Sequence, residues 1–409
     1  MDDVRILILM KITRRLFAFA LLLAPLVFSF AGPAAKPAAN HKYLVFVGTY
    51  TTKTESKGIY SFDFDADTGK LTPKGVAAET PDPSWVAVHP SGKYLYAANE
   101  AGKSSAVSAF AIDAKSGKLT LLNQLPALAE DPCYISFDKT AKYVLVANYT
   151  SGNIVVFPIL PDGKIGEHTA IVQDAGAAGQ NKERQGGPHA HWIEPSAGND
   201  FIYVSDLGLD LVLVYPFDPS KGVPVIIRLS EWQRWSRSKN HPDRRIRLSP
   251  GTGPRHVTFS TDEKFMYVLG ELHSTLTVFV HDVKQETFRK IQEISALPKG
   301  FTGRNDAAEI ALHPNGKFLY TSNRGEDTIA VFSADPAKGT LTFVARVSTG
   351  GKEPRHFAID PSGKYLLAEN QFSNNIVIFK IDAATGGLTP TGQVVEVPSP
   401  VDLTFVPAD

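Results

Sequence analysis

The sequence predicts an all-β fold, a seven-bladed β-propeller with four-stranded antiparallel blades whose ring is closed by N- and C-terminal strands sharing one blade. The first observation is an aromatic residue after a Gly-Lys-type turn, which recurs seven times, and the second is a later apolar run that also recurs seven times. The third is a strand pattern that is missing before the first copy and present after the last. Because a ring grows by adding blades, we expect one domain in spite of the 409 residues.

The recurring aromatic residue is spaced at intervals of 47 to 64 residues, which is typical of one supersecondary unit copied around a ring or along a solenoid. The seven positions are Tyr43, Tyr94, Tyr143, Phe201, Phe265, Phe318 and Tyr365. The later apolar run, which usually ends in aspartate, gives an independent count. It occupies residues 60–63, 110–113, 156–159, 215–218, 279–282, 332–335 and 379–382.

Each unit contains four short runs of the kind that form strands. In the second copy they lie at residues 84–88, 94–98, 106–112 and 119–122, with turn residues between them. Runs of this length with period-two alternation indicate strands rather than helices. Four strands per unit are typical of a propeller blade.

The two ends of the chain predict how the ring closes. The first copy enters at a second strand, residues 43–47, with no first strand before it. The missing pattern appears at residues 400–405, which match the first strand of the second copy at 83–88. A blade built from both termini leaves no open strand edge at the seam.

The N-terminus is typical of an export signal. Lys11, Arg14 and Arg15 precede an apolar run at residues 16–30 that is too short to span a bilayer comfortably. We therefore assign residues 1–31 to a signal peptide of the Sec or twin-arginine type, 32–40 to a spacer and 41–409 to the propeller. We expect a periplasmic or secreted protein with no stable membrane span after removal of the signal.

Composition excludes some classes of function. The chain has 42 basic and 42 acidic residues, so its overall charge attracts neither nucleic acid nor an anionic membrane. Cys133 is the only cysteine, which rules out an intrachain disulfide. It lies at the start of a first strand, as a small packing residue or as a nucleophile in the channel. We expect a monomer.

Polar residues gather at one predicted edge of the ring. In an antiparallel blade the first strand starts where the second strand ends, so these side chains share one mouth of the channel. The first-strand starts supply His189, His191, Arg255, His256, Arg304, Glu309, Arg355 and His356, and the second-strand ends supply Glu100, Asn148, Glu271, Asn323 and Arg324. Ionisable groups are costly in a crowded channel unless they are paired or used, which indicates a site. For Asn residues at strand ends, a role in building turns is the alternative.

These residue types suit the attack of water on an ester carbonyl. An imidazole or carboxylate can accept the proton of water, and arginine can hold an anionic group or a developing oxyanion. Zinc binding by His189 and His191 with Glu271 is a competing use. The sequence has no Gly-x-Ser-x-Gly motif for a serine nucleophile.

Several motifs resemble the seven-bladed propeller lactonases, which include the propeller type of 6-phosphogluconolactonase and the carboxymuconate-lactonizing enzymes. They are residues 46–51 (FVGTYT), 89–96 (HPSGKYLY), 253–256 (GPRH) and 323–325 (NRG). The resemblance runs from about His41 to the C-terminus. It implies hydrolysis of a small sugar lactone in carbohydrate metabolism, without metal or other cofactor. A non-catalytic propeller that binds a ligand or protein, and a muconate-type cycloisomerase, are the alternatives.

The resemblance carries over to residues at the mouth but does not itself settle their individual roles. We expect the catalytic group to be His256, Glu271, Arg255 and His191, with either His256 or Glu271 as the base. We expect the substrate to be bound by His189, Arg304, Glu309, Asn323, Arg324, Arg355, His356, Glu100 and Asn148. Arg255, Arg324 and Arg355 are the expected partners of an anion or oxyanion.

Two insertions depart from the family pattern. Residues 174–187 are rich in Gly, Ala and Gln, and residues 227–249 carry seven basic residues. The basic stretch could attract an anionic substrate, or it is a solvated loop or a sequence anomaly. We expect both insertions to enter first strands, overhang the mouth and form a mobile lid. Because a phosphorylated lactone is a cytoplasmic metabolite, export favours an unphosphorylated or acidic lactone.

Overall fold

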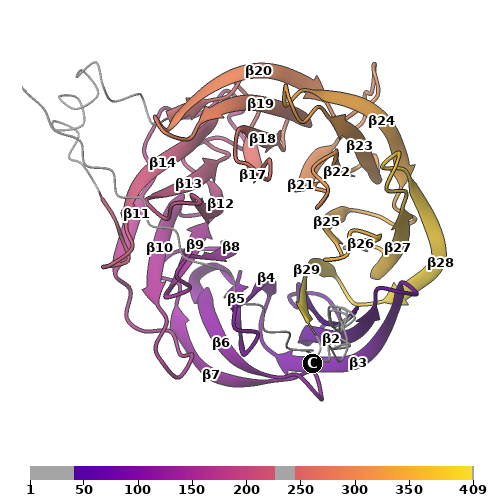
Figure 1. Ribbon diagram of the computed structural model, residues 1–409. Coiled ribbons are helices and arrows are strands. Elements are labelled where there is room, and N and C mark those ends of the chain that lie inside the picture. The colour runs from indigo at the N-terminus through magenta and orange to yellow at the C-terminus, as the bar shows by residue number, and fades with distance from the viewer. Residues whose placement is uncertain (1–40, 226–244, 408–409) are drawn as a thin grey trace, which may run out of the picture. The chain divides into compact units, whose positions relative to one another are not determined.

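A computed structural model describes residues 41–225 and 245–407, which belong to the compact unit Asn40–Asp409. These residues form seven antiparallel sheets arranged in a ring, so the predicted propeller is confirmed (Figure 1). The predicted signal peptide and spacer lie outside the described residues, as does most of the basic insertion. Within the described ranges, no helix is long and apolar enough to cross a bilayer.

The first and second strands of the blades surround the channel (Figure 1). The first strands are β29 (Pro400–Pro407), β4 (Pro83–Val88), β8 (Pro132–Phe137), β12 (Ala190–Pro195), β17 (Pro254–Phe259), β21 (Asp306–Leu312) and β25 (Pro354–Ile359). The second strands are β1 (Lys42–Thr49), β5 (Tyr94–Asn99), β9 (Tyr143–Asn148), β13 (Phe201–Asp206), β18 (Phe265–Gly270), β22 (Phe318–Arg324) and β26 (Tyr365–Asn370).

The third and fourth strands form the outer part of each blade (Figure 1). The third strands are β2 (Gly58–Asp65), β6 (Ala106–Asp113), β10 (Asn153–Pro158), β14 (Leu211–Asp218), β19 (Thr275–Asp282), β23 (Thr328–Ala334) and β27 (Asn375–Ile381). The fourth strands are β3 (Lys70–Glu79), β7 (Lys118–Pro126), β11 (Ala170–Gln173), β15 (Val223–Pro224) with β16 (Arg245–Arg247), β20 (Thr287–Ser295), β24 (Leu341–Ser348) and β28 (Leu388–Glu396). A short 3-10 helix, η1 (Gly102–Ser104), follows β5.

The recurring aromatic residue has a packing role that explains its repeat. The ring of Tyr94 lies against Gly163, in the outer hairpin of the next blade, where an added Cβ would come within 2.3 Å of the ring. Gly163 also has a φ of +84°, which side chains rarely adopt. The same pairing joins Tyr143 to Gly222, Phe265 to Gly339, Phe318 to Gly386 and Tyr365 to Gly69. The aromatic residue and the glycine turn therefore connect neighbouring blades.

The ring closes as the ends of the sequence predicted. Strand β29 pairs antiparallel with β1, with Val45 opposite Phe405 and Gly48 opposite Asp402. The C-terminal strand is thus the first strand of the blade that β1, β2 and β3 complete.

The strand register places the predicted residues at one mouth. Pro254 pairs with Gly270 and Pro354 pairs with Asn370, so each first strand starts beside the end of its second strand. A bulge follows in both strands, because the next paired residues are His256 and His356. The bulge residues are Arg255 and Arg355, and a bulge changes the direction of a side chain.

The two insertions enter the fold at different places. Residues 174–187 connect β11 to β12 and so enter a first strand, as expected. The basic insertion instead interrupts a fourth strand, because β15 pairs with Phe217 and Asp218 whereas β16 pairs with Leu211–Leu213 of the same β14. The expectation that it enters a first strand was wrong. Whether either insertion moves as a lid stays a prediction.

Candidate functional site

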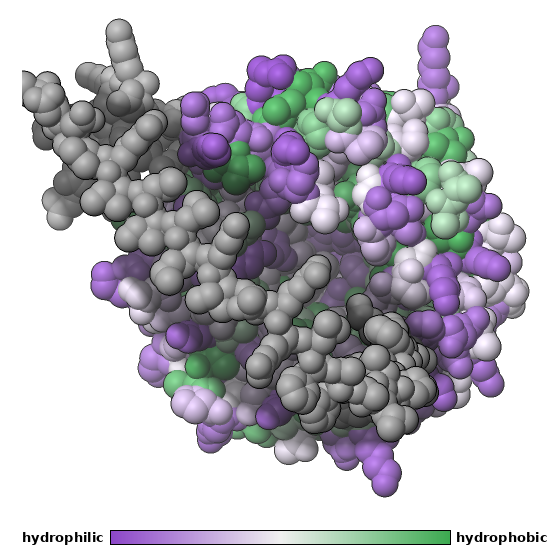
Figure 2. All heavy atoms as spheres, in the orientation of Figure 1, coloured by the Kyte–Doolittle hydropathy of each residue, from purple (hydrophilic) through white to green (hydrophobic). Residues whose placement is uncertain are grey.

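The centre of the site is Glu271, which follows β18 and is contacted by three guanidinium groups. Its carboxylate lies 3.2 Å from Nε of Arg255, 3.2 Å from a terminal nitrogen of Arg324 and 2.5 Å from one of Arg184. We call Arg184, Arg255 and Arg324 the arginine cluster. On the face shown in Figure 2, hydrophilic side chains border the hollow at the centre of the ring.

The arginine cluster fixes the charge of Glu271. Burial opposes ionisation of this carboxyl group, but Arg324 and Arg255 outweigh it and hold the pKa of Glu271 well below its ordinary value. Arg255 is buried beside other positive charges. Burial and the charges of Arg324 and Arg355 lower its pKa to about 10. Glu271 is therefore a permanently charged group that holds the arginines together, and a weak base.

His256 lies beside Arg255 because of the bulge in β17, which directs both neighbours into the channel. The His256 side chain is buried, and its Nδ1 lies 2.8 Å from a carboxylate oxygen of Glu309. Its Nε2 lies 3.3 Å from a guanidinium nitrogen of Arg255. Burial and the Arg255 charge lower the pKa of His256 well below 6.5, so the imidazole is neutral.

A second buried group lies next to His256, around His356. His356 Nδ1 is 3.1 Å from Glu369, and its Nε2 is 3.7 Å from Glu309 and 3.5 Å from Asp402. Burial raises the pKa of Glu309 and Glu369, and it raises that of Asp402 to about 7. One carboxylate, that of Glu309, therefore connects His256 with His356.

This carboxyl group predicts a pH-dependent stability. The folded pKa of Asp402, about 7, exceeds its ordinary value of 3.8, so its contribution is full below pH 3.8 and is lost as pH rises through 7. The loss is at most on the order of 4 kcal/mol. We expect Asp402→Asn to reduce the fall in Tm between pH 5 and pH 8, as measured by calorimetry. An unchanged fall would contradict this assignment.

Arg184 was not among the residues selected from the sequence. It lies on the insertion 174–187, and besides Glu271 it contacts Asp306 at 3.5 Å and the hydroxyl oxygen of Tyr149 at 3.2 Å. The insertion is held by Gln185, whose amide nitrogen donates to Leu207 and Asp210 at 2.8 Å. At least this part of the insertion therefore overhangs the mouth. The sequence signal that could have identified Arg184 is an arginine in a segment that enters a first strand.

The remaining histidines of the mouth pack on Tyr149. The ring of His189 stacks on Tyr149 with centroids 4.7 Å apart, and His191 meets both Tyr149 and His256 edge to face. Burial lowers the pKa of His191 well below 6.5. In residues 41–225 and 245–407 no three His, Cys, Asp or Glu side chains are arranged to hold a metal ion, so the zinc alternative finds no ligand set there.

Cys133 lies close to this group as the bulge residue of β8. Its sulfur is buried, 3.8 Å from Nδ1 of His191 and 3.7 Å from the His191 carbonyl oxygen. Burial raises the pKa of the thiol far above the range of a reactive cysteine. The packing interpretation is therefore the better one.

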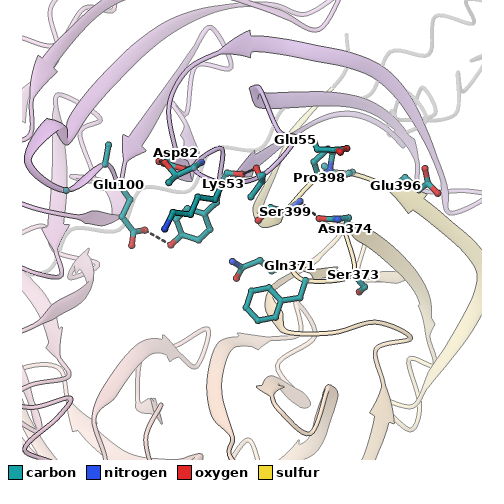
Figure 3. A pocket seen from close by; sticks show the side chains of 17 residues that line it. Lys53, Glu55, Asp82, Glu100, Gln371, Ser373, Asn374, Glu396, Pro398 and Ser399 are labelled. Atoms are coloured by element: carbon teal, nitrogen blue, oxygen red, sulfur yellow. Dashed lines mark hydrogen bonds between the residues drawn. The ribbon is translucent and has the colours of Figure 1, made fainter.

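Arg355 links the site to a neighbouring cleft. Its guanidinium group donates to the hydroxyl oxygen of Tyr50 at 2.8 Å, and that hydroxyl group donates to Glu100 at 2.7 Å. Tyr50 and Glu100 line a cleft of about 1460 Å³ at the mouth (Figure 3). Tyr50 therefore connects Arg355 with the cleft.

Three of the sequence-predicted residues lie apart from this centre. The side chain of Arg304 is 83 % exposed and pairs with Asp306 at 2.8 Å, so it reaches the arginine cluster only through this carboxylate, which Arg184 contacts at 3.5 Å. Asn148 donates to Asn153 at 3.0 Å, and the side chain of Asn323 contacts Ala296, Asn305, Glu326 and Thr328. The two asparagines stabilise the connections between strands. This agrees with the alternative from the sequence analysis, in which asparagines at strand ends build turns.

Comparison with known proteins supports the fold and shows which proteins the chain is similar to. Residues 44–405 match the family described as "Lactonase, 7-bladed beta-propeller". A 6-phosphogluconolactonase from Bacillus subtilis is 37% identical over 76% of this chain and 83% of its own, and one from Formosa agariphila is 33% identical over 75% and 84%. The structure of a periplasmic gluconolactonase from Pseudomonas aeruginosa is 33% identical, with a TM-score of 0.82 over 90% of this chain and 100% of that one.

Proposed function

The chain belongs to the family of seven-bladed β-propeller lactonases, and from this premise we propose that it hydrolyses a sugar lactone at the mouth of its channel. The observation that carries the proposal is the arginine cluster on Glu271 beside a neutral histidine with a carboxylate partner. Lactone hydrolysis needs a stabilised oxyanion and an acceptor for the proton of water. The cluster and His256 can supply these two functions.

The arginines act on the carbonyl oxygen. When water adds to the lactone carbon, this oxygen gains a full negative charge, and fixed guanidinium donors stabilise that charge without rearrangement. Arg255 and Arg324 are held in place by Glu271, and Arg355 by Tyr50. Glu271 is in this mechanism a positioning residue, because its low pKa makes it a poor base.

His256 acts on the proton. Its neutral ring accepts a proton from the attacking water, while Glu309 at 2.8 Å holds the ring and stabilises the imidazolium ion that forms. The bond between the carbonyl carbon and the ring oxygen then breaks. His256 returns the proton to the departing oxygen, and the product is the open hydroxy acid.

We also propose that the protein acts outside the cytoplasm as a monomer on an unphosphorylated lactone. The basic, apolar N-terminus supports export, and the Pseudomonas aeruginosa relative is named as periplasmic. Recovery of the full-length chain from the periplasm or medium of an expressing bacterium is the expected result. Retention in the cytoplasm would contradict the proposed location.

A panel of lactones tests the reaction. We expect glucono-1,5-lactone to be hydrolysed well above its spontaneous rate, and faster than its 6-phosphorylated form, when acid release is followed with a pH indicator. No acceleration with any lactone would favour the non-catalytic alternative. Formation of a lactone from an unsaturated diacid, without hydrolysis of sugar lactones, would favour the cycloisomerase.

A further inference from the structure

The cleft beside Arg355 is much larger than the proposed reaction requires. It has a volume of about 1460 Å³, whereas roughly 300–1,000 Å³ encloses a drug-sized ligand. Its walls are the loop after β1, the segment at η1, the turn between β26 and β27 and the connection from β28 to β29. Of these walls, the proposed hydrolysis uses only Tyr50, through Arg355, and Glu100 behind it.

The charge of the cleft selects against an anionic ligand. Its lining includes one basic residue, Lys53, and four acidic residues, namely Glu55, Asp82, Glu100 and Glu396 (Figure 3). Asp82 already accepts hydrogen bonds from the backbone of Thr51 and Thr52 at 2.7 and 2.8 Å. The surplus of carboxylates disfavours a phosphate or carboxylate in the cleft. A neutral polar ligand fits this lining.

An exposed aromatic ring lies in the same lining. The Phe372 side chain is 69 % exposed, more than that of any other large hydrophobic residue in the described part of the chain. Its loop is fixed, because the backbone NH groups of Gln371 and Phe372 donate to Glu353 and Lys352 at 3.0 and 3.1 Å. Exposure of a phenyl ring costs free energy that a ligand with an apolar face can recover.

The neighbours of Phe372 supply hydrogen-bonding groups. Gln371, Ser373 and Asn374 line the cleft on the same turn, and Glu100 and Lys53 lie across it (Figure 3). A sugar ring has an apolar C–H face and a rim of hydroxyl groups. It can therefore pack on the phenyl ring while its hydroxyl groups bond to these side chains.

We propose that this cleft binds a neutral sugar unit attached to the lactone ring, so that the preferred substrates are lactones of disaccharide or longer aldonic acids. That the bound molecule is a lactone substrate rests on the proposed lactonase function. That the cleft binds a neutral sugar rests on the lining of the cleft alone. The lactone ring lies by Arg355 and Tyr50, and the attached sugar extends toward Phe372. Tyr50 marks the junction, since it belongs to both places.

The first experiment compares cellobiono-1,5-lactone with glucono-1,5-lactone. We expect a higher kcat/KM for the disaccharide lactone by about tenfold or more, in proportion to the buried aromatic surface. Phe372→Ala should remove most of this preference and leave the rate on gluconolactone within about twofold. Phe343→Ala is the matched control, since Phe343 is 41 % exposed on β24 outside the cleft. Equal kcat/KM values for the two lactones in the wild type would overturn the proposal.

The second experiment separates the cleft from the reaction. Calorimetric titration with cellobiose, which has no lactone, should show binding that Phe372→Ala weakens about tenfold. If no lactone is hydrolysed but cellobiose binds through Phe372, the proposed function fails and the sugar site stands. If lactones are hydrolysed and cellobiose does not bind, the sugar site is overturned. Preferential binding of glucose 6-phosphate would overturn it as well.

Discussion

Replacing Arg255 by alanine should reduce kcat for lactone hydrolysis by about 10²–10³, the usual loss for one oxyanion donor. Arg255 is buried at the centre of the mouth, and the positive charges of Arg324 and Arg355 depress its pKa to about 10. Such crowding is unfavourable in the free protein and becomes favourable when a negative charge forms between the guanidinium groups. The loss should therefore fall on kcat more than on KM.

The variant should still fold, because Glu271 keeps its contacts with Arg184 and Arg324. Arg346→Ala is a suitable control. Like Arg255, Arg346 pairs with a carboxylate, that of Glu326 at 3.8 Å. It lies on the outer strand β24, where it packs on the ring of Phe343 at 4.3 Å. Steady-state kinetics of both variants, with Tm values, separate catalysis from stability. A loss below about fivefold for Arg255→Ala would remove the oxyanion role.

The fold could be predicted from the sequence because its repeat reports a contact. Five of the seven recurring aromatic residues pack on a glycine that leaves no room for a Cβ, so both partners recur at the blade spacing. The antiparallel register then places first-strand starts and second-strand ends at one edge. This register alone was enough to predict that one mouth of the channel contains Arg255, His256, Glu271 and Arg324.

The features that the sequence analysis missed or misplaced have a common cause. Their positions are set by the conformation of loops or by local hydrogen bonds, and neither leaves a periodic pattern in the sequence. Arg184 belongs to a Gly-rich loop without periodicity and meets Glu271 from 87 residues away. The second insertion was misplaced because the strands on either side of it, β15 and β16, have two and three residues and give no alternating pattern. Phe372 lies in a turn, where an aromatic residue is not part of an alternating strand pattern, so the sequence did not indicate its position at the cleft.

The choice of His256 as the proposed base also required the structure. Glu271 and His256 were equal candidates in the sequence, since both are able to accept a proton. The contacts separate them, because three arginines surround the carboxylate, whereas the imidazole has a carboxylate partner of its own. A residue's chemistry at a site is thus set by partners that the sequence places far away.

The second prediction with a large effect concerns that base. His256→Ala should lower kcat/KM by about 10²–10⁴, the contribution of a positioned general base. His281→Ala is the matched control, since His281 is also buried beside a carboxylate, Glu286 at 3.4 Å, but lies in an outer strand. The control should keep its activity, although it loses a similar buried pair.

The pH profile distinguishes a base from a merely structural histidine. Because the pKa of His256 lies well below 6.5, the wild-type kcat/KM should be independent of pH above 6.5 and should fall only in more acidic solution. Glu309→Gln removes the charge that stabilises the imidazolium ion, so its acid limb should move to still lower pH while kcat falls. If instead Glu271→Gln moves the acid limb and Glu309→Gln leaves it in place, the carboxylate is the base, and the arginines hold it for that purpose.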